Sequence, residues 1–211
     1  MRADINGTIG LLSKHLRRLQ RSAKALGFIY PGDDVITAAL SHRLTDPSQR
    51  RHPEPHEHRV RLLLSESAAL EITVAKLEPL EANPRIALSN ICLPSDNPWL
   101  QHKTTFRPWY DAATDWLAQH PGFFDLIYLN EKSQLCEGSR SNIYLRFDQQ
   151  WLTPPLPSGL LGGVQRLDLL QQGLVREAVL SKTDLLDATE RRLSNALRGW
   201  FDVQLDLTVG D

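Results

Sequence analysis

The chain has 211 residues, of which 41% are hydrophobic and 23% charged, a composition typical of a folded protein with a sizeable core. Its formal net charge of −1 gives no reason to expect nucleic acid or an acidic membrane surface as a partner. No apolar run approaches the ~20 residues that cross a bilayer, the first residues lack a secretory pattern, and two cysteines make neither a disulfide framework nor a metal set. These features predict a reduced, soluble, cytoplasmic protein.

The first element in the chain is predicted to be an amphipathic helix. Leucine and alanine residues recur between Leu12 and Leu26 at spacings of three and four, which places them on one helix face. Gly27 is a natural stop for this helix. A second, weaker helix is predicted over residues 35–44.

Loops and strands follow. The stretch 46–58 is rich in proline, histidine and charge, and we expect a solvated loop there. Alternating apolar residues predict two strands, and a shorter pattern predicts a third that ends near Pro94. The three predicted strands are 60–64, 70–74 and 86–90.

The second half of the chain mixes helices and strands. A Pro- and Gly-rich loop over 153–163 precedes a helix that has Val164, Leu167 and Leu170 on one face. The remaining predicted elements are a helix over 109–118, strands over 124–129 and 141–147, and a short helix over 184–188.

This order of elements predicts the α+β class in two lobes. The sequence PSDNP at 94–98 indicates a connection between the lobes. We therefore predict a small lobe over 1–94, a connection over 95–105 that carries a lysine, and a larger lobe over 106–211.

Three segments could carry chemistry, although each is weak alone. The first surrounds Lys103, and most lysines are surface charges. The second is Glu137-Gly-Ser-Arg-Ser-Asn142, which could be an ordinary turn at the head of a strand. The third runs from Gly159 to Arg166 and opens a helix, where backbone amides suit a phosphate. Glycine-rich loops also serve purely steric purposes.

Together these segments resemble the class IV aminotransferase family. Its motifs occur here in the family's order, and they span most of the chain. They are H-x-x-R-L at 15–19, K-T-T at 103–105, E-G-S-x-S-N at 137–142, T-P-P-L at 153–156, G-x-L-x-G-x-x-R at 159–166 and S-N-A-L at 194–197. The resemblance implies a two-lobed fold-type-IV pyridoxal-phosphate (PLP) enzyme, like the D-amino-acid and branched-chain aminotransferases.

The resemblance also implies roles for individual residues. Lys103 would bond covalently to the cofactor through its amine and later move the proton. Glu137 would place an anion beside the pyridine nitrogen and keep the ring electron-withdrawing. The positive charge of Arg18 would face the cofactor phosphate. The remaining cofactor-binding residues would be Asn142, the backbone amides of Val164 and Gln165, and, in a further loop, Ala196 and Leu197.

The segment H-K-T-T-x-R-x-x-Y-D at 102–111 looks most like aminodeoxychorismate lyases. These convert 4-amino-4-deoxychorismate to 4-aminobenzoate and pyruvate, a step towards folate. Such a dianionic substrate needs cationic partners, for which Arg107 is the first candidate and Arg140 a poorer one. Arg107 could equally form an ordinary surface or structural ion pair. A small-molecule amine substrate and a homodimer are implied by the family.

Two other functions remain open. A transaminase acting on branched-chain or D-amino acids would use the same cofactor residues, and a non-catalytic homologue would keep only the scaffold. The second is motivated by the start of the chain: the family's opening strand, with its E-T-x-R sequence, has no counterpart before Met1-Arg-Ala-Asp4. We therefore expect either a small lobe shortened at its N-terminus, which exposes a sheet edge, or a start codon assigned late.

Other patterns favour simple structural interpretations. His52, His56 and His58 alternate with acidic residues and could ligate zinc, but nearby prolines and the lack of helical spacing favour a polar loop. We therefore predict no metal site. Cys136 is expected to be a small buried hydrophobic residue, and the five tryptophans are expected to pack in the core and between the lobes.

Overall fold

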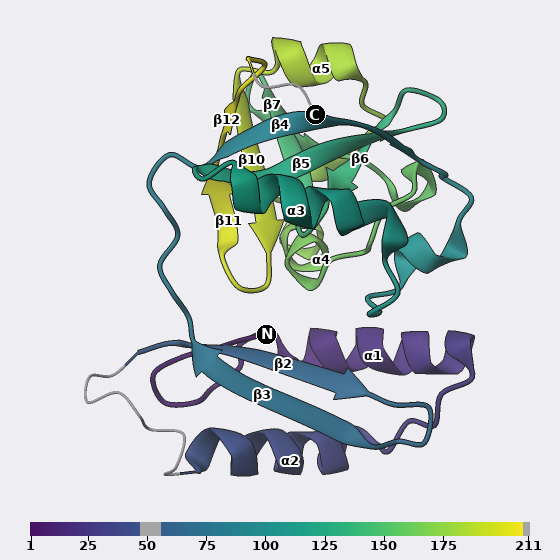
Figure 1. The fold of residues 1–211 in the computed structure, drawn as a ribbon, viewed down its shortest axis with the longest axis vertical. Coiled ribbons are helices and arrows are strands. Elements are labelled where there is room, and N and C mark those ends of the chain that lie inside the picture. The colour runs from purple at the N-terminus through teal and green to yellow at the C-terminus, as the bar shows by residue number, and fades with distance from the viewer. Residues whose placement is uncertain (47–55, 209–211) are drawn as a thin grey trace. The chain divides into compact units, whose positions relative to one another are not determined.

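The computed structural model describes residues 1–46 and 56–208, and the chain divides into two units, Met1–Pro79 and Leu80–Asp211 (Figure 1). Unit 1 contains β1 (Arg2–Ala3), α1 (Leu12–Leu26), α2 (Asp33–Thr45), β2 (His58–Leu64) and β3 (Leu70–Lys76). Its three strands form one antiparallel sheet in the order β1-β2-β3. Residues from both helices and the sheet form its core, namely Ala3, Leu16, Ile36, Leu40 and Val60.

The helices and strands predicted for unit 1 are confirmed. Helix α1 covers the predicted residues and ends at Gly27, whose φ of +77° is a left-handed conformation that glycine adopts without strain. Helix α2 extends the weaker prediction at both ends. Strand β1 pairs with β2, with Ala3 opposite His58, so a short strand lies along that edge of the sheet. Of the predicted loop at 46–58, residues 47–55 lie outside the described residues.

The described residues of unit 2 form two sheets. The four-stranded sheet has the order β12-β4-β5-β6, and the five-stranded sheet has the order β11-β10-β7-β8-β9. The strands are β4 (Arg85–Leu93), β5 (Phe123–Asn130), β6 (Leu135–Gly138), β7 (Asn142–Phe147), β8 (Gln150–Thr153), β9 (Arg176–Glu177), β10 (Glu190–Asn195), β11 (Gly199–Asp202) and β12 (Gln204–Leu205). The helical segments are η2 (Pro98–Gln101), η3 (Pro108–Tyr110), α3 (Asp111–Gln119), η4 (Leu156–Ser158), α4 (Val164–Gln171) and α5 (Lys182–Asp187).

The boundary between the units corrects the one predicted near Pro94. Strand β4 pairs in parallel with β5, and Arg85 forms an ion pair with Asp206, so the chain has already entered unit 2 before Pro94. Residues 95–105 therefore lie inside unit 2 and include η2. The Pro- and Asn-containing composition at 94–98 marks a turn that follows a strand.

One predicted helix face is also corrected. In α4, Val164 is buried as expected, but Leu167 is 40% exposed. Arg166 is buried instead, and its guanidinium donates a 2.7 Å hydrogen bond to the carbonyl of Pro154 and pairs with Glu177. The arginine of the G-x-L-x-G-x-x-R motif therefore joins α4 to the T-P-P-L segment.

The described residues of both units include no helix that is long and apolar enough to cross a membrane. Among these residues no group of histidine, cysteine, aspartate and glutamate is arranged to hold a metal ion. His52, which belongs to the histidine-rich stretch, lies outside them.

Candidate cofactor site

Glu137 lies on β6 and is only 3% exposed. Both of its carboxylate oxygens have donors. The hydroxyl of Tyr110 donates to Oε1 at 2.8 Å, and Nδ2 of Asn142 donates to Oε2 at 3.3 Å. The glutamate is therefore held in one orientation by residues that come before and after it in the chain.

Burial raises the pKa of Glu137 to about 7, because it removes water from the charged form. The hydrogen bond from Tyr110 and the charge of Arg107 lower that pKa, as do a backbone hydrogen bond from Leu161 and the charge of Lys103. Near neutral pH the carboxylate can therefore gain or lose its proton, and its donors favour the ionised form.

Lys103 lies in the loop between η2 and η3 and is exposed. Its positive charge contributes to lowering the pKa of Glu137. The two side chains named by the resemblance therefore lie within electrostatic range of each other, although 34 positions separate them in the sequence.

The glycine-rich loop approaches Glu137 from another side. Asn142 donates a second hydrogen bond, at 2.9 Å, to the carbonyl of Leu161. A Cβ on Gly163 would lie only 2.1 Å from Oδ1 of Asn142, so a larger residue there would displace the Asn142 side chain. Helix α4 begins at the next residue, Val164, and the first turn of any helix leaves N–H groups without intrahelical acceptors. The start of α4 is thereby placed close to Asn142.

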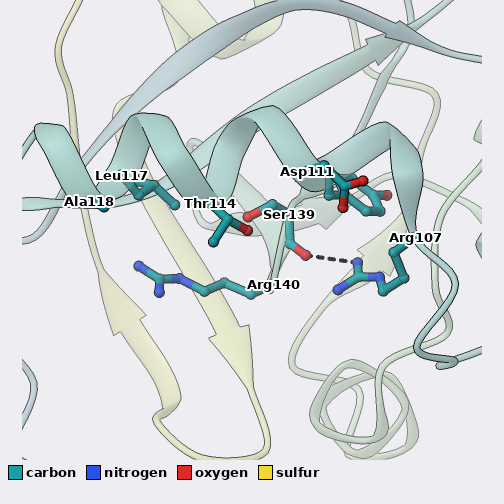
Figure 2. A pocket seen from close by; sticks show the side chains of 8 residues that line it. Arg107, Asp111, Thr114, Leu117, Ala118, Ser139 and Arg140 are labelled. Carbon is teal, nitrogen blue, oxygen red and sulfur yellow. Dashed lines mark hydrogen bonds between the residues drawn. The ribbon is translucent and has the colours of Figure 1, made fainter.

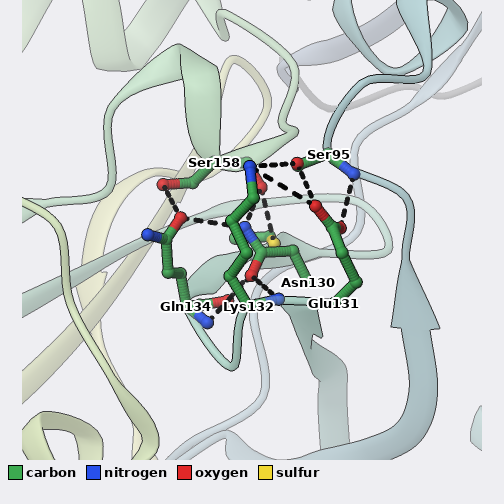
Figure 3. Close-up of polar contacts among 7 residues, drawn as sticks. Ser95, Asn130, Glu131, Lys132, Gln134 and Ser158 are labelled. Carbon is green, nitrogen blue, oxygen red and sulfur yellow. Dashed lines mark hydrogen bonds and ion pairs between the residues drawn. The ribbon is translucent and has the colours of Figure 1, made fainter.

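A second network holds the beginning of this loop (Figure 3). The carbonyl of Ser158 accepts from Nδ2 of Asn130 at 3.0 Å and from the thiol of Cys136 at 3.0 Å. The next residue, Gly159, has φ +88°, and a Cβ there would lie 2.7 Å from Cα of Ser95. The loop is thus packed closely against the β5–β6 turn and the segment that follows β4.

Arg107 borders a cavity of about 460 Å³ beside α3. Figure 2 shows Arg107 and Arg140 on opposite sides of Ser139, with Thr114 and Leu117 on the helix above. Arg107 donates through Nη2 to the carbonyl of Ser139 at 2.7 Å. Arg140 instead directs both Nε and Nη2 to the carbonyl of Phe124. Arg107 is therefore the better placed of the two for an anionic ligand.

The remaining predicted residues differ in position. Ala196 and Leu197 lie in the turn between β10 and β11, where Asn195 donates at 3.3 Å to the carbonyl of Arg140. That bond links the S-N-A-L turn to the E-G-S-R-S-N turn. Arg18 is half-buried on α1 and belongs to unit 1, whereas the other predicted site residues belong to unit 2.

Two side chains in this region were not assigned a role from the sequence. Tyr110 donates a hydrogen bond to Glu137. Its place in the K-T-T-x-R-x-x-Y pattern is the sequence feature that points to a role at the site. Asp125, which is fully buried in β5, belongs to none of the sequence motifs, although an acidic residue in an apolar strand is itself a signal. Cys136 is buried as predicted, and burial raises its pKa, which makes it a poor nucleophile.

The donor set suits PLP. That cofactor requires an amine, an anion beside a ring nitrogen and donors for a phosphate, and unit 2 supplies Lys103, the buried Glu137 and the start of α4. The missing Cβ at Gly163 lets the start of α4 approach Asn142. The residues present therefore fit the cofactor.

Known proteins resemble this chain over most of its length. The family model "Amino-transferase class IV" matches residues 1–205. A Schizosaccharomyces pombe protein named "Putative aminodeoxychorismate lyase" is 30% identical over 199 residues, which cover 92% of this chain and 83% of that protein. The D-alanine aminotransferase of Bacillus licheniformis is 25% identical over 203 residues, which cover 88% of this chain and 70% of that enzyme.

The solved structure of a "Putative amino-acid aminotransferase" from Mesorhizobium loti superposes with a TM-score of 0.85 at 31% identity. The match covers 98% of this chain and 97% of that one. The fold is therefore the α+β fold of the fold-type-IV enzymes, as the sequence predicted. The family match and these relatives show that the chain belongs to the class IV aminotransferases, a family of PLP-dependent enzymes.

Proposed function

We propose that this chain is a PLP-dependent lyase that converts 4-amino-4-deoxychorismate to 4-aminobenzoate and pyruvate. The observation that carries the proposal is the H-K-T-T-x-R-x-x-Y-D segment at 102–111, in which Arg107 lies against the Tyr110 ring and Tyr110 donates to Glu137. The Schizosaccharomyces pombe relative named for this activity supports it. Folate biosynthesis is the corresponding biological role.

PLP, when bound, withdraws electrons from the carbon that carries the substrate amine. The amine of Lys103 would hold the cofactor and, once the substrate amine has displaced it, would be free to remove the proton from that carbon. Glu137 would supply a negative charge to the ring nitrogen of the cofactor, and the hydrogen bond from Tyr110 favours that charged form. Loss of the proton and cleavage of the ether C–O bond make the substrate ring aromatic, and the released enol takes up a proton to become pyruvate.

The other residues bind and orient. Arg107 binds a substrate carboxylate at the cavity beside α3. The backbone amides of Val164 and Gln165 bind the phosphate, and Asn142 fixes the loop that carries those amides. Arg18 stays a predicted phosphate-binding residue. Ala196 and Leu197 border the same end of the site. We further propose a cytoplasmic homodimer, which sedimentation equilibrium would test.

The decisive experiment measures products from 4-amino-4-deoxychorismate with PLP and without any 2-oxo acid. Equal amounts of pyruvate and 4-aminobenzoate are expected, with loss of activity in Lys103→Ala and normal activity in Lys182→Ala, an exposed lysine on α5. A reaction that proceeds only when a 2-oxo acid is added would identify a transaminase, the function of the Bacillus licheniformis relative.

Borohydride reduction in the presence of PLP, followed by peptide mapping, tests the lysine separately. The adduct is expected on Lys103. An adduct on another lysine would overturn the site assignment, and no adduct at all would favour the non-catalytic scaffold.

A further inference from the structure

Asp125 lies within β5 and is fully buried. A buried carboxylate strongly destabilises a fold unless donors surround it. Here four donors come from one short turn: the backbone N–H of Ser139 at 2.9 Å, its hydroxyl at 2.6 Å, the N–H of Arg140 at 3.1 Å, and the hydroxyl of Ser141. The carboxylate therefore determines the path of the chain between β6 and β7.

Gly138 allows this close approach. A Cβ on Gly138 would lie 2.2 Å from Oδ2 of Asp125 and 2.6 Å from the hydroxyl of Ser141. The residue before this glycine is Glu137, and the residue after Ser141 is Asn142. The turn held by Asp125 thus has a candidate cofactor residue at each end.

The turn also connects to Arg107. The carbonyl of Ser139 accepts from Nη2 of Arg107 at 2.7 Å, and the guanidinium carbon of Arg107 lies 4.3 Å from the centre of the Tyr110 ring. Tyr110 in turn donates to Glu137. The turn, Arg107, Tyr110 and Glu137 therefore form a closed ring of contacts, and Asp125 holds the turn.

We propose that Asp125 is a positioning residue that fixes both the Glu137 carboxylate and the Arg107 guanidinium through the Gly138–Ser141 turn. It touches neither group itself. The importance of these two groups for cofactor and substrate rests on the proposed function, whereas the positioning can be tested without either molecule.

The primary test is an NMR titration of the Glu137 carboxyl carbon in the cofactor-free protein. Tyr110, Arg107, Lys103, Leu161 and Asn142 face this group, and displacement of the turn would withdraw the Arg107 charge and the Tyr110 donor. Asp125→Asn places a donor opposite the N–H of Arg140 and is expected to raise the pKa of Glu137 by about 0.5 or more. Ser139→Ala keeps the Asp125 carboxyl group and is expected to raise the pKa of Glu137 by a smaller amount.

Asp148→Asn, an exposed acid in the β7–β8 turn, is the matched control and should leave the titration unchanged. If Asp125→Asn does not fold, Ser139→Ala and Ser141→Ala provide the same measurement. Unaltered Glu137 titration in the folded variants would overturn the proposal, even if their stability falls.

PLP affinity and the KM for substrate provide the second measurement. Both are expected to worsen about tenfold in Asp125→Asn, since an error of about 1 Å in a binding group has effects of this size or larger. A wild-type protein that binds no PLP would refute the proposed function, while the Glu137 titration would still decide the role of Asp125.

Discussion

The hydroxyl of Tyr110 donates a 2.8 Å hydrogen bond to Oε1 of Glu137, and both residues are buried. Tyr110 is the last residue of η3, directly before α3, and Glu137 lies near the end of β6, so the bond joins two separate parts of unit 2. Since burial alone raises the pKa of Glu137, this donor helps to determine whether the carboxyl is charged at neutral pH.

Tyr110→Phe is therefore expected to raise the pKa of Glu137 above its present value of about 7. A rise of about one unit would reduce the ionised fraction at pH 7 from about one half to about one tenth. PLP binding should weaken about fivefold at pH 7 in proportion to that fraction, and should recover towards pH 9. Absorbance titrations with PLP from pH 6 to 9 would measure this change in affinity.

Tyr30→Phe, in unit 1, is the control for this experiment. Parallel curves of PLP affinity against pH for Tyr110→Phe and wild type would contradict the prediction.

Glu137 also makes the stability of unit 2 depend on pH. Its pKa is about 7 in the folded protein against an ordinary value of 4.5, so the folded state binds more protons between these values. The contribution of Glu137 to the stability of unit 2 is therefore fully present below pH 4.5 and is lost as pH rises through 7. The loss amounts to about 3 kcal/mol in total. Glu137→Gln cannot ionise and should lack this decline.

Urea unfolding followed by tryptophan fluorescence at several pH values would measure the difference. All five tryptophans lie within Leu80–Asp211, so the signal reports unit 2 alone. Burial also raises the pKa of Asp125, but that group contributes equally in both proteins. Equal slopes of stability against pH would show that Glu137 ionises normally.

Gly163→Ala tests the approach of the glycine-rich loop to Asn142. The φ of −61° at Gly163 suits any residue, so the only conflict is the 2.1 Å contact between the new Cβ and Oδ1 of Asn142. Asn142 must move, and PLP affinity is expected to fall about tenfold or more because the start of α4 moves with it. Gly10→Ala is a matched control, since nothing lies within 4 Å of its Cβ position. Similar affinities in both variants would mean that the loop does not bind the cofactor.

Local patterns predicted local structure well. The leucine spacing and Gly27 predicted α1 because both signals come from residues close together in the sequence. One is the amphipathic face of the helix, and the other is a glycine that adopts the left-handed conformation at its end. The unit boundary depended on partners far along the chain. Residues 94–98 have the composition of a linker. However, β4, which precedes them, pairs with β5, whose residues come more than 30 positions later in the sequence. Only this pairing shows that β4 belongs to unit 2.

The site shows the same contrast. Motif order selected Lys103, Glu137 and Asn142, and the structure places the last two in direct contact. The role of Asp125 is not predictable from the motifs, because it depends on donors from a turn 14 positions away, which no spacing in the sequence reveals. The spacing predicts that Leu167 lies on the buried face of α4. In the structure Arg166 is buried there instead, because its guanidinium has polar partners, and Leu167 is exposed.

The buried arginine of the G-x-L-x-G-x-x-R motif gives a final prediction, about stability. Arg166 donates to the carbonyl of Pro154 and pairs with Glu177, but only the carbonyl is deeply buried, since the Glu177 side chain is 45% exposed. Arg166→Met leaves that acceptor unsatisfied and is expected to destabilise unit 2 by about 2 kcal/mol. Glu177→Gln removes only an exposed ion-pair partner and should change stability by less than about 1 kcal/mol. Tryptophan-monitored urea unfolding would compare the two variants. Equal losses would show that the ion pair, rather than the bond to Pro154, joins α4 to the T-P-P-L segment.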